Sequence, residues 1–150
     1  EFFLSSRVRP EALREVYYAF DRADLLPEST PALETLYQML TDNPEVKIRL
    51  TAHTDRRGTA SYNARLSQQR AESVVRYLIG RGIAPERLEA MGRGSDEPYT
   101  VTKRTAAVHP FLAVGTVLTP DFIASLSSPE EQAVCDQLNR RTAFEVRATP

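Results

Sequence analysis

Two side chains of opposite charge have the spacing to form a binding site. Asp55 directly follows an apolar run, and Arg70 lies within an amphipathic helical pattern, four residues from both Leu66 and Val74. The helical period therefore places Arg70 on the apolar stripe. Because a guanidinium stays charged and is costly to bury alone, we expect it to extend outward or to meet an anion.

Two alternative arrangements of Asp55 and Arg70 are consistent with the sequence. In one, Asp55 and Arg70 form an internal salt bridge within a strand-to-helix unit. In the other, they form a half-open pair for a zwitterion, in which the carboxylate binds an ammonium group and the guanidinium binds a carboxylate in a forked contact. Each charge-assisted hydrogen bond contributes about 1.5–3 kcal/mol, which predicts weak but selective binding of an amino-acid-like group.

Catalysis is less well supported by the residues. A hydrolytic set of His53, Asp55 and Ser67 lacks the context of a nucleophile elbow, and a metal set of His53, Asp55 and His109 lacks a recognised ligand spacing. His53 is expected to be a strand-end residue with hydrogen-bond partners. We therefore expect a binding protein that is not an enzyme and uses no cofactor and no metal.

Composition narrows the class of protein. The chain has 150 residues with a formal net charge of −1, which gives no broad electrostatic reason to bind nucleic acid or an anionic membrane. The single cysteine, Cys135, cannot form an internal disulfide and is expected to be a small buried hydrophobic residue. No apolar run approaches the roughly 20 residues of a transmembrane helix.

Alternating patterns predict the elements that position the pair. Residues 15–20 are β-branched and aromatic, as in a strand, and Ser29 or Thr30 is placed to cap a helix that ends at 42–44. Residues 46–53 alternate with the two-residue period of a half-buried strand that ends just before Asp55. A second helix follows from about 61 to 80–82, and residues 87–91 predict another strand.

The region 99–138 interrupts this order. It contains two short helical patterns, at 119–126 and 128–138, which we expect to lie on the surface of the core, and residues 140–146 supply a last strand. The predicted fold is α+β: a βαβαβ-β core whose mixed sheet packs on two long helices, with a short-helix insertion before the last strand. Residues 1–14 are expected to be a linker or the remnant of a preceding region, and 15–150 one domain.

Four ordered segments carry a family resemblance: FDRADLLPES, TAHTDRRGTASYNARLSQQRAESVVRYLIGRGI, RLEAMGRGSDEP and NRRTAFEV. Together they resemble the peptidoglycan-binding OmpA-like C-terminal domain of Gram-negative envelope proteins, over roughly residues 15–98 and 139–148. The resemblance implies non-covalent binding of peptidoglycan, in the periplasm and in association with the outer membrane. It also implies that the domain anchors an envelope assembly to the cell wall.

The resemblance assigns roles to residues at matching positions. Asp55 and Arg70 match those that grip the amino and carboxyl ends of diaminopimelate in the stem peptide. Asn63 matches a pocket residue, with helix capping as an alternative, and Leu66 matches a wall beside the ligand's aliphatic chain. The remaining matches are Asp21 in the loop after the first strand, and Arg140 and Arg141 in the NRR motif. Thr54 and Arg57, whose orientation the sequence does not determine, are further candidates to offer backbone amides near the ligand carboxylate. For Arg141 a structural or solvated role is the alternative.

The insertion at 99–138 is larger than in most members of the family. It resembles the version in Bacteroidetes-type members, including the peptidoglycan-binding component of the type IX secretion system, which implies a role in protein transport and partners among envelope or secretion-system proteins. The alternative function is a protein-docking module acting through this insertion. Exposed Phe111, Leu112 or Phe122 would favour docking, whereas burial of these residues against the sheet would oppose it.

Overall fold

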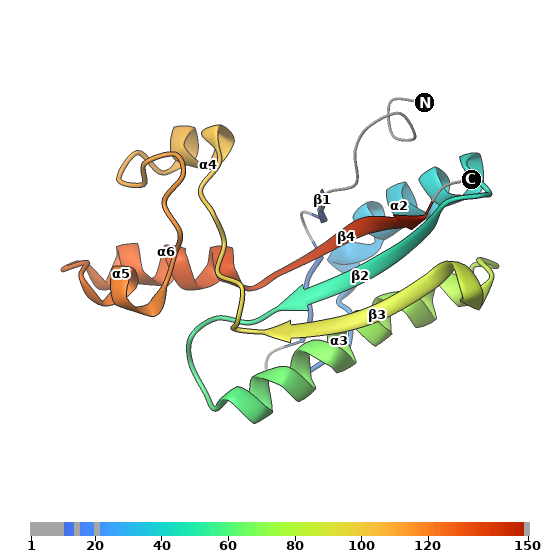
Figure 1. Cartoon of the computed structure of the whole chain (residues 1–150), viewed down its shortest axis with the longest axis horizontal. Helices are drawn as coiled ribbons and strands as arrows, with labels where there is room; N and C mark the ends of the chain where they lie inside the picture. Colours follow the sequence, from blue (N-terminus) through green and yellow to red (C-terminus); the bar gives the residue numbers. More distant parts are fainter. Residues whose placement is uncertain (1–10, 14–15, 20–21, 149–150) are drawn as a thin grey trace.

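A four-stranded mixed sheet forms the centre of the fold in the computed structural model, which describes residues 11–13, 16–19 and 22–148 (Figure 1). The strands run in the order β1-β4-β2-β3 across the sheet. Their bounds are β1 Glu11–Leu13, β2 Lys47–His53, β3 Leu88–Gly94 and β4 Arg141–Ala148. β2 and β3 are parallel, whereas β4 pairs antiparallel with both β2 and β1. The predicted α+β class with a mixed sheet is confirmed.

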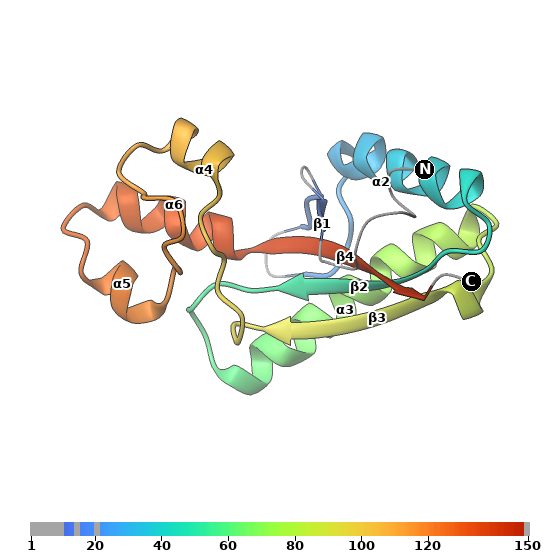
Figure 2. The same cartoon turned by 45° about the horizontal axis from the view of Figure 1, so that its top comes forward.

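Two long helices cover one face of this sheet. α2 (Thr30–Asp42) and α3 (Ala60–Gly80) lie on the same side of it in both views (Figures 1 and 2). Leucines of α2 pack with Val74 and Leu78 of α3 against Ile48 and Leu50 of β2, forming one apolar core. A short 3₁₀ helix, Pro27–Ser29, leads into α2, and another, Pro85–Arg87, leads into β3. Both long helices lie close to their predicted ranges.

β2 is more buried than its alternating sequence predicts. Ile48, Leu50 and Ala52 face the core as expected, but Thr51 and His53 are only 3% and 6% exposed. The cause is the position of β2 between β3 and β4, whose side chains flank it on the face away from the helices. Asp55 therefore follows the end of a strand whose side chains are buried on both faces of the sheet.

α3 packs unusually close to β3. The Gly92 amide donates to Gln68 Oε1 at 2.8 Å, and the Gly94 amide donates to Ser67 Oγ at 2.9 Å. A Cβ atom on Gly92 would lie 2.2 Å from the Gln68 backbone nitrogen, so a side chain there is sterically excluded. This contact sets the distance of α3, and hence of Arg70, from the sheet.

The first strand lies earlier than predicted. Residues 16–19 of the predicted 15–20 strand do not join the sheet, and the ends of that range, residues 15 and 20, are outside the described part. Tyr18 forms an isolated bridge with Leu25, and the Leu26 amide donates to the Tyr17 carbonyl. The backbone groups of this strand-prone segment are thus satisfied by the next turn of the chain. β1 falls within residues 1–14, so part of the range expected to be a linker or the remnant of a preceding region pairs with β4 in the sheet.

The insertion forms a lobe with its own small core. It contains three helices, α4 (Lys103–Val108), α5 (Pro120–Ala124) and α6 (Pro129–Asn139), of which α4 was not predicted. Buried Val101, Leu112, Leu118, Ile123 and Cys135 form a cluster separate from the main core. The lobe extends beyond one end of the sheet, and α6 leads directly into β4 (Figures 1 and 2). The prediction of helices lying on the core surface is therefore wrong, because the insertion buries its apolar residues within itself; burial of Cys135 is confirmed.

Within the described residues, no helix is long and apolar enough to cross a membrane.

Candidate functional site

Asp55 is a buried carboxylate held by two arginines. The residue is 6% exposed and lies two positions beyond the end of β2. Its Oδ2 atom accepts from Arg57 Nη2 at 2.8 Å and from Arg140 Nη1 at 2.5 Å. Its Oδ1 atom accepts from the Arg57 backbone amide at 2.9 Å, closing a tight turn. Among the described residues, the ion pairs of Asp55 are with these two arginines and not with Arg70.

These contacts keep Asp55 ionised. Burial acts to raise the pKa of the carboxyl group, but the hydrogen bonds from the Arg57 side chain and backbone and from Arg140 outweigh it, so the pKa lies below its usual value. Asp55 therefore presents a negative charge at neutral pH in a largely desolvated position, where a cationic ligand group would be bound more strongly than in water.

The loop that carries Asp55 is fixed by Asn63. Its side-chain amide donates to the Arg57 carbonyl at 2.9 Å, and the residue is 4% exposed. Gly58 completes the turn with a φ of +90°, a conformation that favours glycine. Asn63 does not cap α3, because Thr59 is the N-cap and accepts from the Tyr62 amide. The capping alternative for Asn63 is thus wrong, and its observed role is to position the site loop.

The end of the insertion reaches the same loop. Arg140, which follows α6, contacts Asp55, and Arg56 pairs with the buried Asp136 of α6 with an Nε–Oδ1 distance of 3.0 Å. Arg141 points elsewhere: it donates to the Glu97 carbonyl at 2.9 Å, and its Cζ lies 5.7 Å from the centroid of the Tyr99 ring. Arg140 therefore belongs to the Asp55 cluster, whereas Arg141 holds the connection between β3 and the insertion.

Arg70 lies at the edge of the buried stripe of α3 rather than within it. Its Cζ lies 4.8 Å from the centroid of the Tyr18 ring, and its Nε donates to the Arg22 carbonyl at 2.9 Å. The Tyr18 hydroxyl donates to the Arg70 carbonyl at 3.3 Å and shares a 2.9 Å hydrogen bond with Thr142 Oγ1. Burial raises the pKa of Tyr18 to about 12, against the opposing effects of the Thr142 hydrogen bond and the Arg70 charge. The aromatic ring thus fixes Arg70 against the loop that precedes α2.

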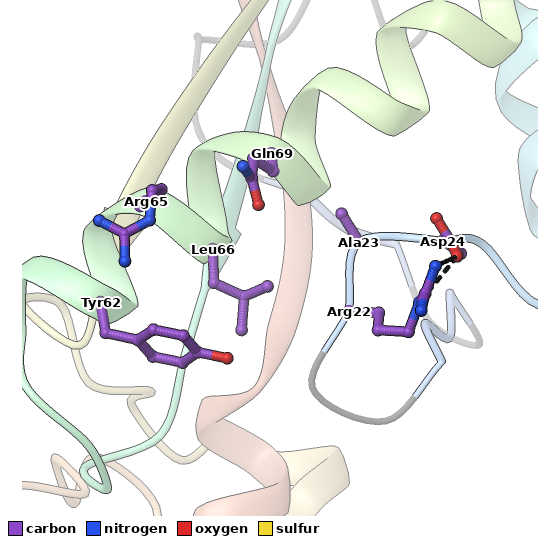
Figure 3. A pocket seen from close by; sticks show the side chains of 7 residues that line it. All are labelled: Arg22, Ala23, Asp24, Tyr62, Arg65, Leu66 and Gln69. Atoms are coloured by element: carbon purple, nitrogen blue, oxygen red, sulfur yellow. Dashed lines mark hydrogen bonds and ion pairs between the residues drawn. The ribbon is translucent and has the colours of Figure 1, made fainter.

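An open pocket of about 350 Å³ lies between that loop and α3 (Figure 3). Tyr62 and Leu66 extend from α3 toward the loop, which carries an Arg22–Asp24 ion pair with an Nη2–Oδ2 distance of 2.7 Å. The pocket is lined by Arg22, Ala23, Asp24, Tyr62, Arg65, Leu66 and Gln69. Leu66, predicted as a pocket wall, does line a pocket, and Arg70 adjoins it through the Arg22 carbonyl.

The structure bears differently on the predicted roles of Asp21 and of the Thr54 and Arg57 amides. Asp21 lies outside the described residues. The backbone amides of Thr54 and Arg57, expected to face a ligand carboxylate, are already engaged: Thr54 donates to the Gly94 carbonyl at 2.8 Å, and Arg57 donates to Asp55. That expectation is wrong because the first amide extends the β2–β3 pairing and the second closes the Asp55 turn.

The side chains named in the hydrolytic and metal alternatives form hydrogen bonds with other groups than one another. Ser67 Oγ donates to the Ala64 carbonyl at 3.0 Å and accepts from Gly94, while His53 Nε2 lies 3.3 Å from Thr51 Oγ1. In the part of the chain that the structure describes, His53 Nδ1 has no hydrogen-bond partner, and there is no group of three or more His, Cys, Asp or Glu suited to a metal ion.

Sequence reasoning missed the residues that orient the pair. Tyr18 was expected only as a strand former and Thr142 only as part of the last strand, although Tyr18 contacts Arg70 and Thr142 holds the Tyr18 hydroxyl. Arg57 was assigned only a backbone role, yet its side chain binds Asp55. Its position two residues after Asp55 is the signal that indicates a turn of this kind. Nothing local indicates the Tyr18–Thr142 contact, which spans 124 positions.

Several proteins are similar to this chain. Outer membrane protein A of Shimwellia blattae is 41% identical over 88 residues, covering 57% of this chain and 36% of that protein. Outer membrane protein P5 of Haemophilus influenzae is 34% identical over 86 residues, covering 57% of this chain and 24% of that protein. The chain thus matches about a quarter to a third of the length of these relatives.

Solved structures share the fold over nearly the whole chain. The cell wall anchor of the type VI secretion system from Pseudomonas aeruginosa has a TM-score of 0.60 at 25% identity, covering 94% of this chain and 80% of that one. The peptidoglycan-associated lipoprotein of Burkholderia pseudomallei has a TM-score of 0.62 at 24% identity, covering 96% of this chain and 92% of that one. The sequence model of the OmpA family matches residues 17–109, more than half of the chain. The chain belongs to the OmpA family.

Proposed function

We propose that this domain binds peptidoglycan non-covalently through the diaminopimelate of the stem peptide. The observation that carries the proposal is the buried, ionised Asp55 at the end of β2, with Arg70 fixed on the neighbouring helix. Membership of the OmpA family and similarity to a type VI secretion cell wall anchor support it. The free end of a diaminopimelate side chain is a zwitterion, so it offers one group to each of these side chains.

The ammonium group binds Asp55. Of the two arginines on this carboxylate, Arg57 is the more exposed, with 65% of its side chain accessible against 38% for Arg140. Arg57 is also tied to Asp55 through its backbone amide, so its side chain can leave without loss of the turn. The ligand ammonium therefore takes the position of the Arg57 guanidinium, while Arg140 and the Arg57 amide keep the carboxylate oriented.

The carboxylate group of the ligand binds Arg70. A guanidinium carries five N–H donors in a planar fork, which suits bidentate binding of a carboxylate. The Tyr18 ring and the Arg22 carbonyl fix the plane of this fork before a ligand arrives, so less conformational entropy is lost on binding. Leu66, one turn earlier on α3, contacts the aliphatic part of the diamino acid.

The proposed activity is binding without catalysis. The domain acts in the periplasm, where it links the cell wall to an envelope assembly. A modest affinity for one stem peptide is sufficient, because the polymer offers many adjacent copies to a multivalent assembly. A specific assignment to a Bacteroidetes-type member and to the type IX secretion system, with a role in protein transport, rests on the 99–138 insertion and stays a prediction.

A docking role for the insertion would depend on other residues than Phe111, Leu112 and Phe122, which were expected to form the docking surface. Leu112 is buried, and Phe111 and Phe122 are half-buried in the core of the insertion itself. The exposed apolar residues of the lobe are instead Val108, Val114 and Val117, at 66%, 57% and 44%. Charged substitutions at these valines that release an envelope partner, without loss of wall binding, would support docking as a second function.

Co-sedimentation with insoluble peptidoglycan sacculi tests the proposed function. The parent domain is expected to sediment, and Asp55→Asn and Arg70→Gln are each expected to weaken retention by at least about tenfold. Arg104→Gln, an exposed arginine on α4, is the matched control. Free diaminopimelate should compete for the protein, whereas lysine with blocked α-amino and α-carboxyl groups, which offers only a side-chain ammonium, should not. Folded variants that sediment like the parent would refute the proposal, and circular dichroism verifies that they are folded.

A further inference from the structure

Two ion pairs of opposite direction join the site loop, residues 54–59, to the end of α6. In the first, Arg56 of the loop binds Asp136 of α6, with an Nε–Oδ1 distance of 3.0 Å and an Nη2–Oδ2 distance of 3.3 Å. In the second, Arg140, which follows α6, binds Asp55 of the loop. The Arg140 amide donates to the Asp136 carbonyl at 3.2 Å, so both of these residues belong to the same helical turn. A movement of this turn would therefore affect both ion pairs.

The apolar core of the lobe is not shared with the rest of the domain. Among the described residues, its buried side chains form a cluster separate from the core between the sheet and the long helices. The lobe extends beyond the end of the sheet, and α6 leads into β4, whose first residue pairs with the last residue of β2 (Figures 1 and 2). The end of α6 thus lies where the site loop begins, and ion pairs at this point can orient the lobe on the loop.

The Arg56–Asp136 pair is costly to break. The Asp136 side chain is 8% exposed and that of Arg56 is 30% exposed, so loss of either partner leaves the other charge poorly solvated. The Asp136 charge also acts on the next residue of the loop. The pKa of Arg57 is raised chiefly by its hydrogen bond with Asp55 and, to a smaller extent, by the charge of Asp136. Asp136 therefore stabilises the positive charge of both loop arginines.

We propose that the Arg56–Asp136 pair is a latch, which holds the last turn of α6 on the site loop and thereby keeps Arg140 and the loop in the arrangement that orients Asp55. The inference rests on the proposed function and deepens it, because it concerns the affinity of the same carboxylate for the ligand ammonium. Arg56 and Asp136 are positioning residues, since they act on Asp55 through Arg140 and the loop backbone. By thermodynamic linkage, a partner that moves the lobe would change wall binding, and wall binding would change the affinity for that partner by the same factor.

Isothermal titration calorimetry with diaminopimelate tests the latch. Arg56→Gln removes a positive charge near Asp55, so charge alone would increase the affinity for an ammonium group, whereas loss of the latch should decrease it about fivefold or more. Asp136→Asn should decrease it to a similar extent. The double variant should lose no more than either single variant, because the same interaction is removed in all three. Arg104→Gln on α4 and Glu130→Gln on α6, which change exposed charges of the same signs, should bind like the parent.

Hydrogen exchange of the ligand-free domain, followed by NMR, gives a second measurement. The Arg57 amide donates to Asp55 and closes the turn. Asp136→Asn, a change within the lobe, should speed exchange of this amide by about the same factor, whereas Glu130→Gln should not. Circular dichroism verifies that the variants are folded. The Arg56→Gln/Asp136→Asn double variant leaves no unpaired buried charge, so it replaces a single variant that does not fold.

The two measurements separate the latch from the site that it orients. A folded Arg56→Gln variant that binds diaminopimelate as tightly as the parent, or more tightly, would overturn the latch and leave the proposed function intact. Unchanged exchange of the Arg57 amide in Asp136→Asn would also overturn the latch. If the parent binds no diaminopimelate but exchange of the Arg57 amide depends on Asp136, the proposed function fails, and the link between the lobe and the Asp55 turn is supported.

Discussion

Arg140 donates from Nη1 to Oδ2 of Asp55 across 2.5 Å, although the two residues lie 85 positions apart in the chain. The contact exists because α6 ends at Asn139 and leads directly into β4, which pairs with β2. The three-helix insertion thus returns the chain to the sheet with an arginine beside the carboxylate. A segment that looked peripheral in the sequence completes the electrostatics of the candidate site.

Arg140→Gln is expected to raise the pKa of Asp55 toward its ordinary value, because one of the groups that lowers it is lost. A lowered pKa in the folded state contributes stability above the unfolded pKa, and this contribution is lost as pH falls through the folded value. The variant should therefore be less stable than the parent at neutral pH and should lose less stability than the parent as pH falls below the unfolded pKa. At neutral pH the loss should be about 1 kcal/mol, since Arg140 is 38% exposed and partly screened.

Carboxyl titration of Asp55 by NMR checks this expectation, together with urea unfolding at several pH values. Arg104→Gln controls for the general effect of removing a positive charge. An unchanged Asp55 titration in Arg140→Gln would show that Arg57 alone determines the ionisation of the site.

Tyr18→Phe separates the hydroxyl from the ring that lies beside Arg70. The variant loses the hydrogen bonds to the Arg70 carbonyl and to Thr142, so we expect a loss of about 0.5–1.5 kcal/mol for each well-formed bond. It keeps the aromatic face, so retention on sacculi should fall only slightly. Tyr18→Leu removes that face as well and should weaken retention further. If both variants bind the wall equally well, the ring does not orient Arg70.

Gly92→Ala should destabilise the domain strongly. Its Cβ would lie 2.2 Å from the Gln68 backbone nitrogen, so α3 must move away from β3. We expect a loss of at least about 1–3 kcal/mol, as for overpacking of a core, and weaker wall binding, since α3 carries Arg70. Gly80→Ala is the matched control, because nothing lies within 4 Å of its Cβ and it ends α3. Thermal unfolding of both variants tests the difference, and equal melting temperatures would contradict the close packing.

The predictable part of this structure was local. The spacing of Leu33, Leu36 and Leu40 predicted α2, and the alternation of Ile48, Leu50 and Ala52 predicted β2, because burial of one face determines both patterns. The position of Asp55 after β2 followed from the same pattern. The first strand could not be placed, since residues 16–19 have strand-forming side chains but pair with residues 24–26.

The unpredictable part depended on contacts between distant segments. Arg140 reaches Asp55 only because the insertion folds as a separate lobe, and Tyr18 reaches Thr142 and Arg70 only once β4 is in the sheet. The helical period placed Arg70 on the apolar stripe, whereas Ser67, Ala71 and Val74 form its buried part. A half-buried arginine beside an aromatic ring has the same sequence pattern as one that faces an internal anion.

His53 makes the domain sensitive to mild acid. The residue is 6% exposed, and its pKa is lowered from 6.5 to about 3, chiefly by burial and further by the charges of Arg141 and Arg93. The unfolded chain therefore binds a proton at this side chain below about pH 6.5 while the folded chain does not. Stability conferred by the neutral imidazole is complete above that pH and declines as pH falls toward 3.

Urea unfolding between pH 7.5 and 5 measures this decline. The parent should lose stability over that interval, and His53→Gln, which cannot be protonated there, should show a flatter dependence even though its stability at pH 7.5 is lower. Because His53 ends β2 two positions before Asp55, wall binding should weaken over the same interval only if the strand end opens. A parent profile as flat as that of His53→Gln would mean that the imidazole is protonated in the folded domain, with Arg141 and Arg93 turned away from it.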